Sequence, residues 1–102
     1  MNKEPESLIS RLNLETAQIP WRDLQTFFAA GMVLSVSEDL DLLHVAEQLA
    51  ADNAPVFQEW LSSGKVGKVE DSQAMEWFDR DTLLWAVVIK PWVLVQQRKQ
   101  EN

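Results

Sequence analysis

The chain has 102 residues, of which 46% are hydrophobic and 25% are charged, and its three glycines and four prolines are typical of one globular domain. It has no cysteine, so disulfide bonds, thiolate metal ligands and cysteine nucleophiles are excluded. Sixteen acidic residues against nine Lys and Arg give a net charge of −7. This charge disfavours nucleic acid and membrane partners, because both require clustered cations.

The negative charge is concentrated between Asp23 and Gly64, where seven acidic residues occur without a Lys or Arg. A solubilising surface explains such a stretch, and a basic protein partner is the alternative. The first residues, MNKEPESL, contain acids and a proline where a signal peptide needs a basic start and an apolar run. We therefore expect a cytoplasmic protein.

Two helices and a strand are predicted in the first third of the chain. Residues 4–16 have a helical pattern with an apolar stripe of Leu8, Ile9 and Leu12. A second helix is expected to begin at Pro20, which suits a first helical turn, and to end at Gly31 as a left-handed cap. Residues 32–37, MVLSVS, are too few for a helix and rich in valine, so they predict a strand.

Three further helices and a weak strand are predicted between residues 39 and 81. The clearest helix covers residues 39–52, and its apolar face carries Leu42, Leu43, Ala46, Leu49 and Ala50. A short helix over residues 56–61 should end at Gly64, and residues 65–69 predict a strand with a bulge at Gly67. The last helix, capped by Asp71 or Ser72, carries Met75 and Phe78.

The most apolar run, TLLWAVVIKPWVLVQ over residues 82–96, is interrupted by Lys90 and Pro91 and is too short for a membrane helix. Its valine, isoleucine and tryptophan content favours a strand with two apolar faces, buried on both sides. A straight strand of this length would span about 50 Å, so we expect it to bend or break at Pro91. The prediction is a single α+β domain over residues 1–96, with about five helices packed on a small sheet built around this run. A polar tail over residues 97–102 should follow.

Several landmarks occur in order from about Leu8 to Gln96, namely IPWRDL, AAGMVLSV, DLDLLHVAEQLA, EWLSSGKV and LLWAVVIKPWVLVQ. Together they resemble the bacterial domain-of-unknown-function family 2288. The resemblance implies a small bacterial single-domain protein. It supplies no activity, ligand or catalytic residue.

Asp41 and His44 are the candidates for chemistry. His44, the only histidine, lies three residues after Asp41 on the polar face of the predicted third helix. Such a pair could act as an oriented general base or ligate a hard metal ion. However, no second histidine or cysteine completes a transition-metal site, and polar residues gather on the solvent side of any amphipathic helix. We therefore expect no catalytic residue, metal or cofactor. A small acid–base or metal-dependent enzyme or binder is the alternative.

Five tryptophans are present, namely Trp21, Trp60, Trp77, Trp85 and Trp92. Because indoles serve cores, ligand pockets and interfaces alike, a small-molecule pocket lined by tryptophans is a further alternative.

The leading prediction is a non-catalytic module that forms a homodimer or binds another protein. Trp92 and Leu94 are the predicted interface, because the apolar helix faces suffice for one side of the sheet and a second copy could cover the other. The competing view is a monomer in which the first two helices close over that side.

Overall fold

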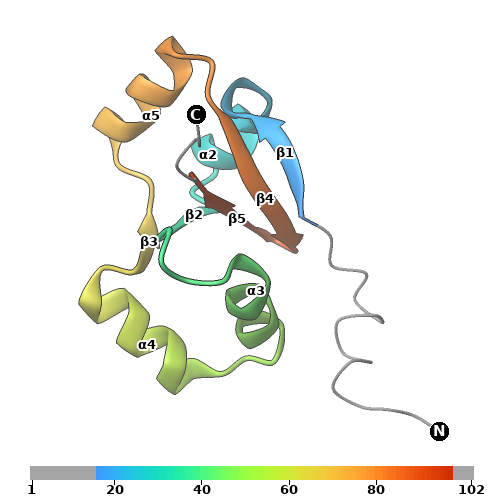
Figure 1. The fold of residues 1–102 in the computed structure, drawn as a ribbon, viewed down its shortest axis with the longest axis vertical. Helices are drawn as coiled ribbons and strands as arrows, with labels where there is room; N and C mark the ends of the chain where they lie inside the picture. The colour runs from blue at the N-terminus through green and yellow to red at the C-terminus, as the bar shows by residue number, and fades with distance from the viewer. Residues whose placement is uncertain (1–15, 98–102) are drawn as a thin grey trace, which may run out of the picture.

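The computed structural model describes residues 16–97, which form one α+β domain (Figure 1). In chain order its elements are β1 (Ala17–Pro20), the 3-10 helix η1 (Trp21–Leu24), α2 (Gln25–Ala29), β2 (Val33–Val36), α3 (Leu42–Ala50), α4 (Ala54–Ser63), β3 (Val66–Lys68), α5 (Asp71–Asp79), β4 (Leu83–Ile89) and β5 (Trp92–Gln96). The described part thus contains four α-helices, one fewer than predicted. The first predicted helix, over residues 4–16, lies outside the described residues except for Thr16.

The five strands form one sheet in the order β1-β4-β5-β2-β3. The β2–β5 pair is parallel, and the other three pairs are antiparallel. The predicted break of the apolar run at Pro91 is confirmed. β4 and β5 form a hairpin in which Ile89 lies opposite Trp92, and the turn between them contains a cis Lys90–Pro91 peptide bond. A proline at this position removes no ladder hydrogen bond.

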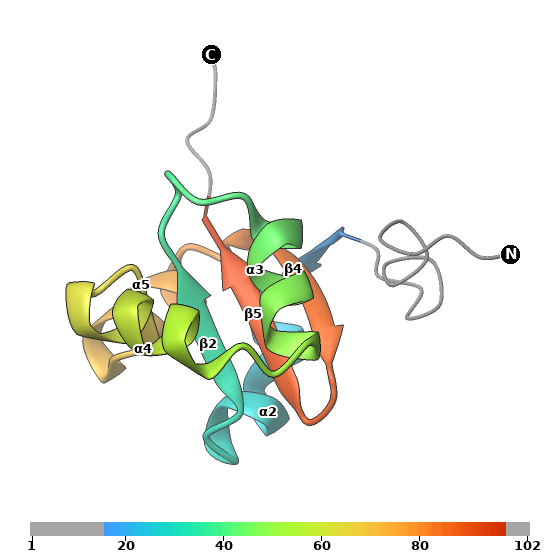
Figure 2. The same cartoon turned by 90° about the horizontal axis from the view of Figure 1, so that it is seen from below.

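Both faces of the sheet are covered by helices. Figures 1 and 2 show α3 and α4 on one side, and α2 and α5 on the other. On the side of η1, α2 and α5, here called the α5 face, the strands contribute Val33, Leu84, Ala86, Val93 and Val95. On the side of α3 and α4, the α3 face, they contribute Leu34, Val36, Val66, Val87 and Leu94. Alternate residues point to opposite faces of a strand, so the run contributes buried residues to both sides as predicted, but Leu83 and Val88 of β4 are exposed.

The prediction that a helix begins at Pro20 is wrong. Residues Ala17–Pro20 form an edge strand paired with β4, and Pro20 lies opposite Leu83 at its end. The pairing continues into the next residue, because the Trp21 backbone N–H donates to the Thr82 carbonyl at 2.9 Å. Helical structure then begins with Trp21 and reaches Ala29, and the predicted left-handed Gly31 follows at φ 75°. Because the missing backbone N–H of proline suits an edge strand as well as a first helical turn, Pro20 alone could not distinguish a strand from a helix start.

The helices after β2 match the predicted ones closely. Asp41 caps α3, and α4 ends at the left-handed Gly64, as predicted for a glycine without a Cβ clash. The bulge predicted at Gly67 is absent, because Gly67 pairs regularly with Ser35. Residue Glu70, and not Asp71 or Ser72, occupies the N-cap position of α5.

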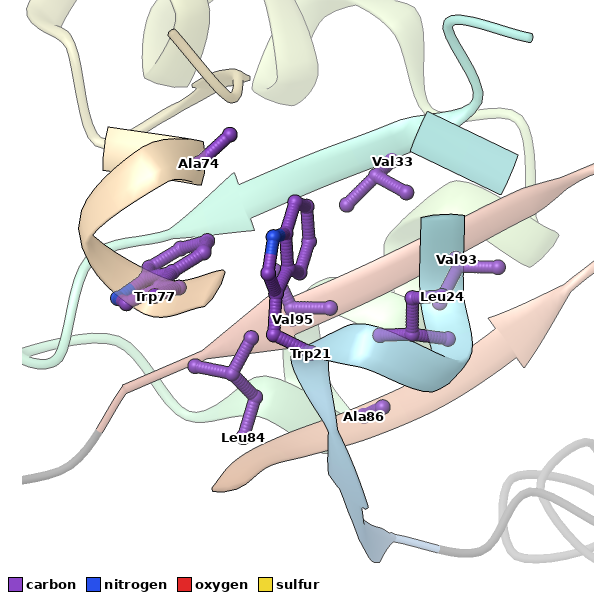
Figure 3. Packing of buried hydrophobic residues seen from close by; sticks show 9 residues of the cluster. All are labelled: Trp21, Leu24, Val33, Ala74, Trp77, Leu84, Ala86, Val93 and Val95. Atoms are coloured by element: carbon purple, nitrogen blue, oxygen red, sulfur yellow. The ribbon is translucent and has the colours of Figure 1, made fainter. Parts of the chain in front are cut away.

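The buried residues of α5 are Ala74 and Trp77, whereas Met75 and Phe78, the residues marked by the sequence, are exposed. Figure 3 shows Trp21 and Trp77 together with the β-strand side chains on the α5 face. The rings of Trp21 and Trp77 pack edge to face with their centroids 5.0 Å apart. Phe28 packs against Trp21 in the same way, with a centroid distance of 5.2 Å. An aromatic cluster therefore closes this face of the sheet.

Gln97 is the last described residue, and its side-chain oxygen accepts a hydrogen bond from Trp77 Nε1 at 3.0 Å. The rest of the predicted polar tail lies outside the described residues. Within residues 16–97, no helix has the length and apolar character needed to cross a membrane.

Candidate functional site

The structure uses Asp41 and His44 in ways that do not form a catalytic pair. The Asp41 carboxylate accepts a hydrogen bond from the Leu43 backbone N–H at 3.1 Å, which is the role of a helix cap. His44 is exposed on α3 and packs edge to face against Trp60, with ring centroids 6.0 Å apart. No hydrogen bond joins Asp41 to His44 among the described residues, which also contain no cluster of three or more His, Asp or Glu that could hold a metal ion.

A polar cluster that the sequence did not indicate surrounds Asp39, in the loop before α3. Its carboxylate accepts hydrogen bonds from Lys65 and Ser37 and forms an ion pair with Lys65. These hydrogen bonds hold the pKa of the Asp39 carboxyl below its usual value of 3.8, and the bond from Lys65 has the largest effect. The cluster ties the loop to the start of β3.

Gln96 fixes the same loop from inside the domain. It is the buried polar residue at the end of β5, and its side-chain N–H group donates to the carbonyls of Ser37 at 2.8 Å and Leu40 at 2.7 Å. The alternation along β5 points Gln96 to the α3 face, which is where this loop enters α3. The final glutamine of the P-W-V-L-V-Q landmark therefore has a structural role.

Three depressions stand out on the surface of residues 16–97, and no tryptophan lines any of these three. One of about 370 Å³ lies beside β3 and the start of α5, and a smaller one of about 200 Å³ lies where α3 joins α4. The third, of about 390 Å³, lies between α2 and α5. The tryptophans pack elsewhere: Trp21 and Trp77 in the α5-face core, and Trp60, Trp85 and Trp92 against the α3-face core. The predicted tryptophan-lined pocket has no counterpart in these depressions.

Trp21 Nε1 is a buried donor without a hydrogen-bond partner among the described residues. In Figure 3 this nitrogen lies on the side of the indole that faces Trp77. The indole packs edge to face against the rings of Phe28 and Trp77.

The depression between α2 and α5, here called the α2–α5 groove, is the most apolar of the three. It is lined by Gln25, Phe28, Asp71, Ala74, Met75, Phe78 and Asp79. Met75 is 65% exposed and Phe78 is 42% exposed, while Phe28 and Ala74 form the deeper part next to the aromatic core. Exposed apolar side chains gathered around a hollow are typical of binding surfaces.

Arg22 holds one end of the α2–α5 groove in place. Its Nε and Nη2 donate to the Phe78 carbonyl at 3.2 and 3.0 Å, and its guanidinium carbon lies 4.5 Å from the centre of the Phe78 ring. Since the Phe78 carbonyl belongs to the last turn of α5, the cation satisfies a helix end and orients the aromatic ring. In the IPWRDL sequence, Trp21 therefore belongs to the core, and Arg22 binds the end of α5.

The predicted interface residues lie in different environments. Leu94 is 0% exposed and belongs to the core of the α3 face, so it offers no surface to a second copy. Trp92 is half-buried and packs against the same core. The expectation of an uncovered side of the sheet fails, because η1, α2 and α5 cover it. The competing view is supported for the second predicted helix, which corresponds to η1 and α2.

The α2–α5 groove was not predicted from the sequence. Two apolar pairs at helical spacing compete on α5, Ala74 with Trp77 and Met75 with Phe78, and the sequence alone favoured the second pair. Trp77 has the larger apolar surface and could have indicated the buried side.

The fold and this surface define a small α+β domain with a five-stranded mixed sheet and an apolar groove between two short helices. The family model described as "Protein of unknown function (DUF2288)" matches residues 7–97, and the chain belongs to this family. The expected resemblance is confirmed.

Among solved structures, the chain is similar to the protein of the "NMR solution structure of PA1075 from Pseudomonas Aeruginosa". The two are 43% identical, with a TM-score of 0.79, over 100% of this chain and 94% of the other. A comparison with curated proteins finds no match.

Proposed function

We propose that this protein is a non-catalytic protein-interaction module that binds another protein through the α2–α5 groove. The observation that carries the proposal is the exposure of Met75 and Phe78 around an apolar hollow next to the domain core. A long flexible thioether and an aromatic ring at a surface suit protein recognition, since methionine adapts to different partners and aromatic residues often anchor interfaces.

The arrangement supports binding in preference to catalysis. Asp41 is engaged as a helix cap, and His44 packs against Trp60, so neither orients the other for proton transfer. The α2–α5 groove itself contains two carboxylates, Asp71 and Asp79, at opposite ends of α5, with apolar side chains between them. This is the layout of an apolar contact surface with a polar rim.

The proposal places the partner outside this chain. Homodimerisation through Trp92 and Leu94 loses its support, because Leu94 is already buried within one copy. A bacterial, cytoplasmic setting stays a prediction from the sequence.

Selection from a random peptide library tests the proposal. The wild-type chain serves as bait, and the double variant Met75→Ser, Phe78→Ser serves for counter-selection. Met75 is 65% and Phe78 is 42% exposed, so the variant should lose at most about 2 kcal/mol and stay folded, which urea unfolding checks. We expect enriched peptides with apolar residues at helical spacing that bind the wild type and not the variant. Peptides that bind both chains equally, or no enrichment, would contradict the proposal.

A further inference from the structure

We infer that the partner of the α2–α5 groove is a basic amphipathic helix. Its apolar residues would lie on Met75 and Phe78, and one Lys or Arg toward each end would lie near Asp71 and Asp79. The inference rests on the proposed function and adds to it the chemical class of the partner.

The surface around the α2–α5 groove is negatively charged, which favours a partner with a cationic group. The segment from Glu70 to Asp81 contains five acidic residues and a single basic one, Arg80. That arginine lies 3.7 Å from Glu76, and Arg22 lies 3.7 Å from Asp81. Asp71 and Asp79, the two carboxylates that line the groove, form no ion pair with another described residue. A partner that covers the groove removes water from these carboxylates, and a basic group offsets that cost.

The spacing of the two carboxylates suits a helix. Asp71 and Asp79 are the first and last residues of α5. Eight residues at 1.5 Å per residue separate their Cα atoms by about 12 Å along the helix axis. Two cationic residues seven or eight positions apart on a partner helix have nearly the same separation. Apolar residues at the third and fourth positions after the first cation then share the face that meets the groove.

Strand addition does not fit this site. The two edges of the sheet are β1 and β3, whereas the groove is formed by the helices α2 and α5. A partner therefore has no free strand edge to pair with at the groove and must bind through its side chains, as a helix in a groove does.

Other occupants meet specific obstacles. A second copy of this chain would bring the acidic α5 surfaces together, and like charges in an interface oppose association. The last five residues, Arg98 to Asn102, include two cations but no apolar side chain that could cover Met75 and Phe78. A nucleic acid would meet carboxylates at both ends of the groove.

Three model peptides of fifteen residues test the inference by NMR titration of the full ¹⁵N-labelled chain. The first has a leucine stripe with a lysine at each end of it, seven positions apart. The second has glutamates in place of those lysines, and the third keeps the lysines but has serines in place of the leucines. We expect the first peptide to shift the amide signals of α2 and α5 and to bind at least about tenfold more tightly than either other peptide.

A matched pair of variants locates the charge effect. Asp71→Asn with Asp79→Asn should weaken binding of the lysine peptide by about fivefold or more. Glu38→Gln with Glu59→Gln removes the same charge from exposed positions in the loop before α3 and in α4. This variant should leave the affinity within about twofold of the wild type, since neither residue lines the groove and exposed charges are screened by salt.

The outcomes separate this inference from the proposed function. Equal binding of the lysine and glutamate peptides at α2 and α5 would overturn the basic partner and leave the apolar binding surface intact. Shifts confined to other elements, or no binding by any peptide at millimolar concentration, would overturn both.

Discussion

The two faces of the sheet are covered by helices of different length and different packing. On the α3 face, α3 has nine residues and packs aliphatic side chains on the strands, and α4 has ten residues and adds the partly buried rings of Phe57 and Trp60. On the α5 face, η1 and α2 have four and five residues, and only α5 has nine. The shorter cover is completed by the aromatic cluster of Trp21, Phe28 and Trp77.

The difference shows how a small domain can bury a sheet on both sides and still keep an apolar groove. Large aromatic side chains fill the space over the strands from few residues, because each indole buries a large area. Two short helices held apart by such a cluster do not close over each other, and Met75 and Phe78 stay at the surface. The face whose buried core includes the rings of Trp21 and Trp77 is the face with the α2–α5 groove.

The largest expected effect is the loss of the central ring on the α5 face. Trp21→Ala should lower the free energy of unfolding by about 3 to 5 kcal/mol, because the side chain is 0% exposed and its removal leaves a cavity. On the α3 face, Trp60→Ala should cost about 1 to 2 kcal/mol, since Trp60 is only half-buried. Urea unfolding measures both. Equal losses would mean that the two faces do not differ in their dependence on a single ring.

A second effect concerns the polar anchor of the α3 face. Gln96→Leu should cost about 1 to 3 kcal/mol, because the carbonyls of Ser37 and Leu40 lose their donor in a partly buried site. Amide hydrogen exchange should become faster in the loop between β2 and α3. Gln97→Leu, at an exposed position with one hydrogen bond to Trp77, is the matched control and should cost less than about 1 kcal/mol. If Gln97→Leu lost as much stability as Gln96→Leu, burial would not explain the importance of Gln96.

The corresponding anchor on the α5 face is Arg22, which is about half exposed, so its removal should have a smaller effect. Arg22→Ala should cost about 1 kcal/mol and should change the NMR signals of the Phe78 ring, since the guanidinium bonds to the Phe78 carbonyl and lies over that ring. Arg80→Ala, which removes only an exposed pair with Glu76, should cost no more than about 0.5 kcal/mol. Unchanged Phe78 signals in Arg22→Ala would contradict the positioning role.

The smallest effect is pH-dependent and belongs to the loop before α3. Because hydrogen bonds from Lys65 and Ser37 lower the pKa of Asp39 in the folded chain, its ionised form stabilises the fold above the ordinary value of 3.8. This contribution is lost as the pH falls through the lowered folded pKa. Asp39→Asn should therefore lower Tm slightly at pH 7, and the difference from the wild type should shrink below pH 4. A difference that is constant with pH would exclude the ionised carboxylate as its cause.

Local patterns determined much of the fold. The apolar face of α3, the left-handed glycines at positions 31 and 64, and the break at Pro91 were all read correctly from neighbouring residues. These features depend on helix periodicity, on a missing Cβ and on a missing backbone donor, which are properties of a few adjacent residues. That β4 contributes buried residues to both sides was also visible in the sequence, because both of its alternating sets are apolar, although Leu83 and Val88 are exposed.

Features that depend on the partner of a residue were decided only by the tertiary structure. Pro20 ends a strand and does not begin a helix, because β4 lies beside it. On α5, Trp77 faces inward and Met75 does not, because Trp77 packs against the ring of Trp21 on the inner side. The cover of the α5 face comes from η1, α2 and α5, so Leu94 is buried and the α2–α5 groove becomes the exposed apolar surface. Spacing within one helix or strand sets which residues share a side, but only contacts between distant segments decide which side is buried.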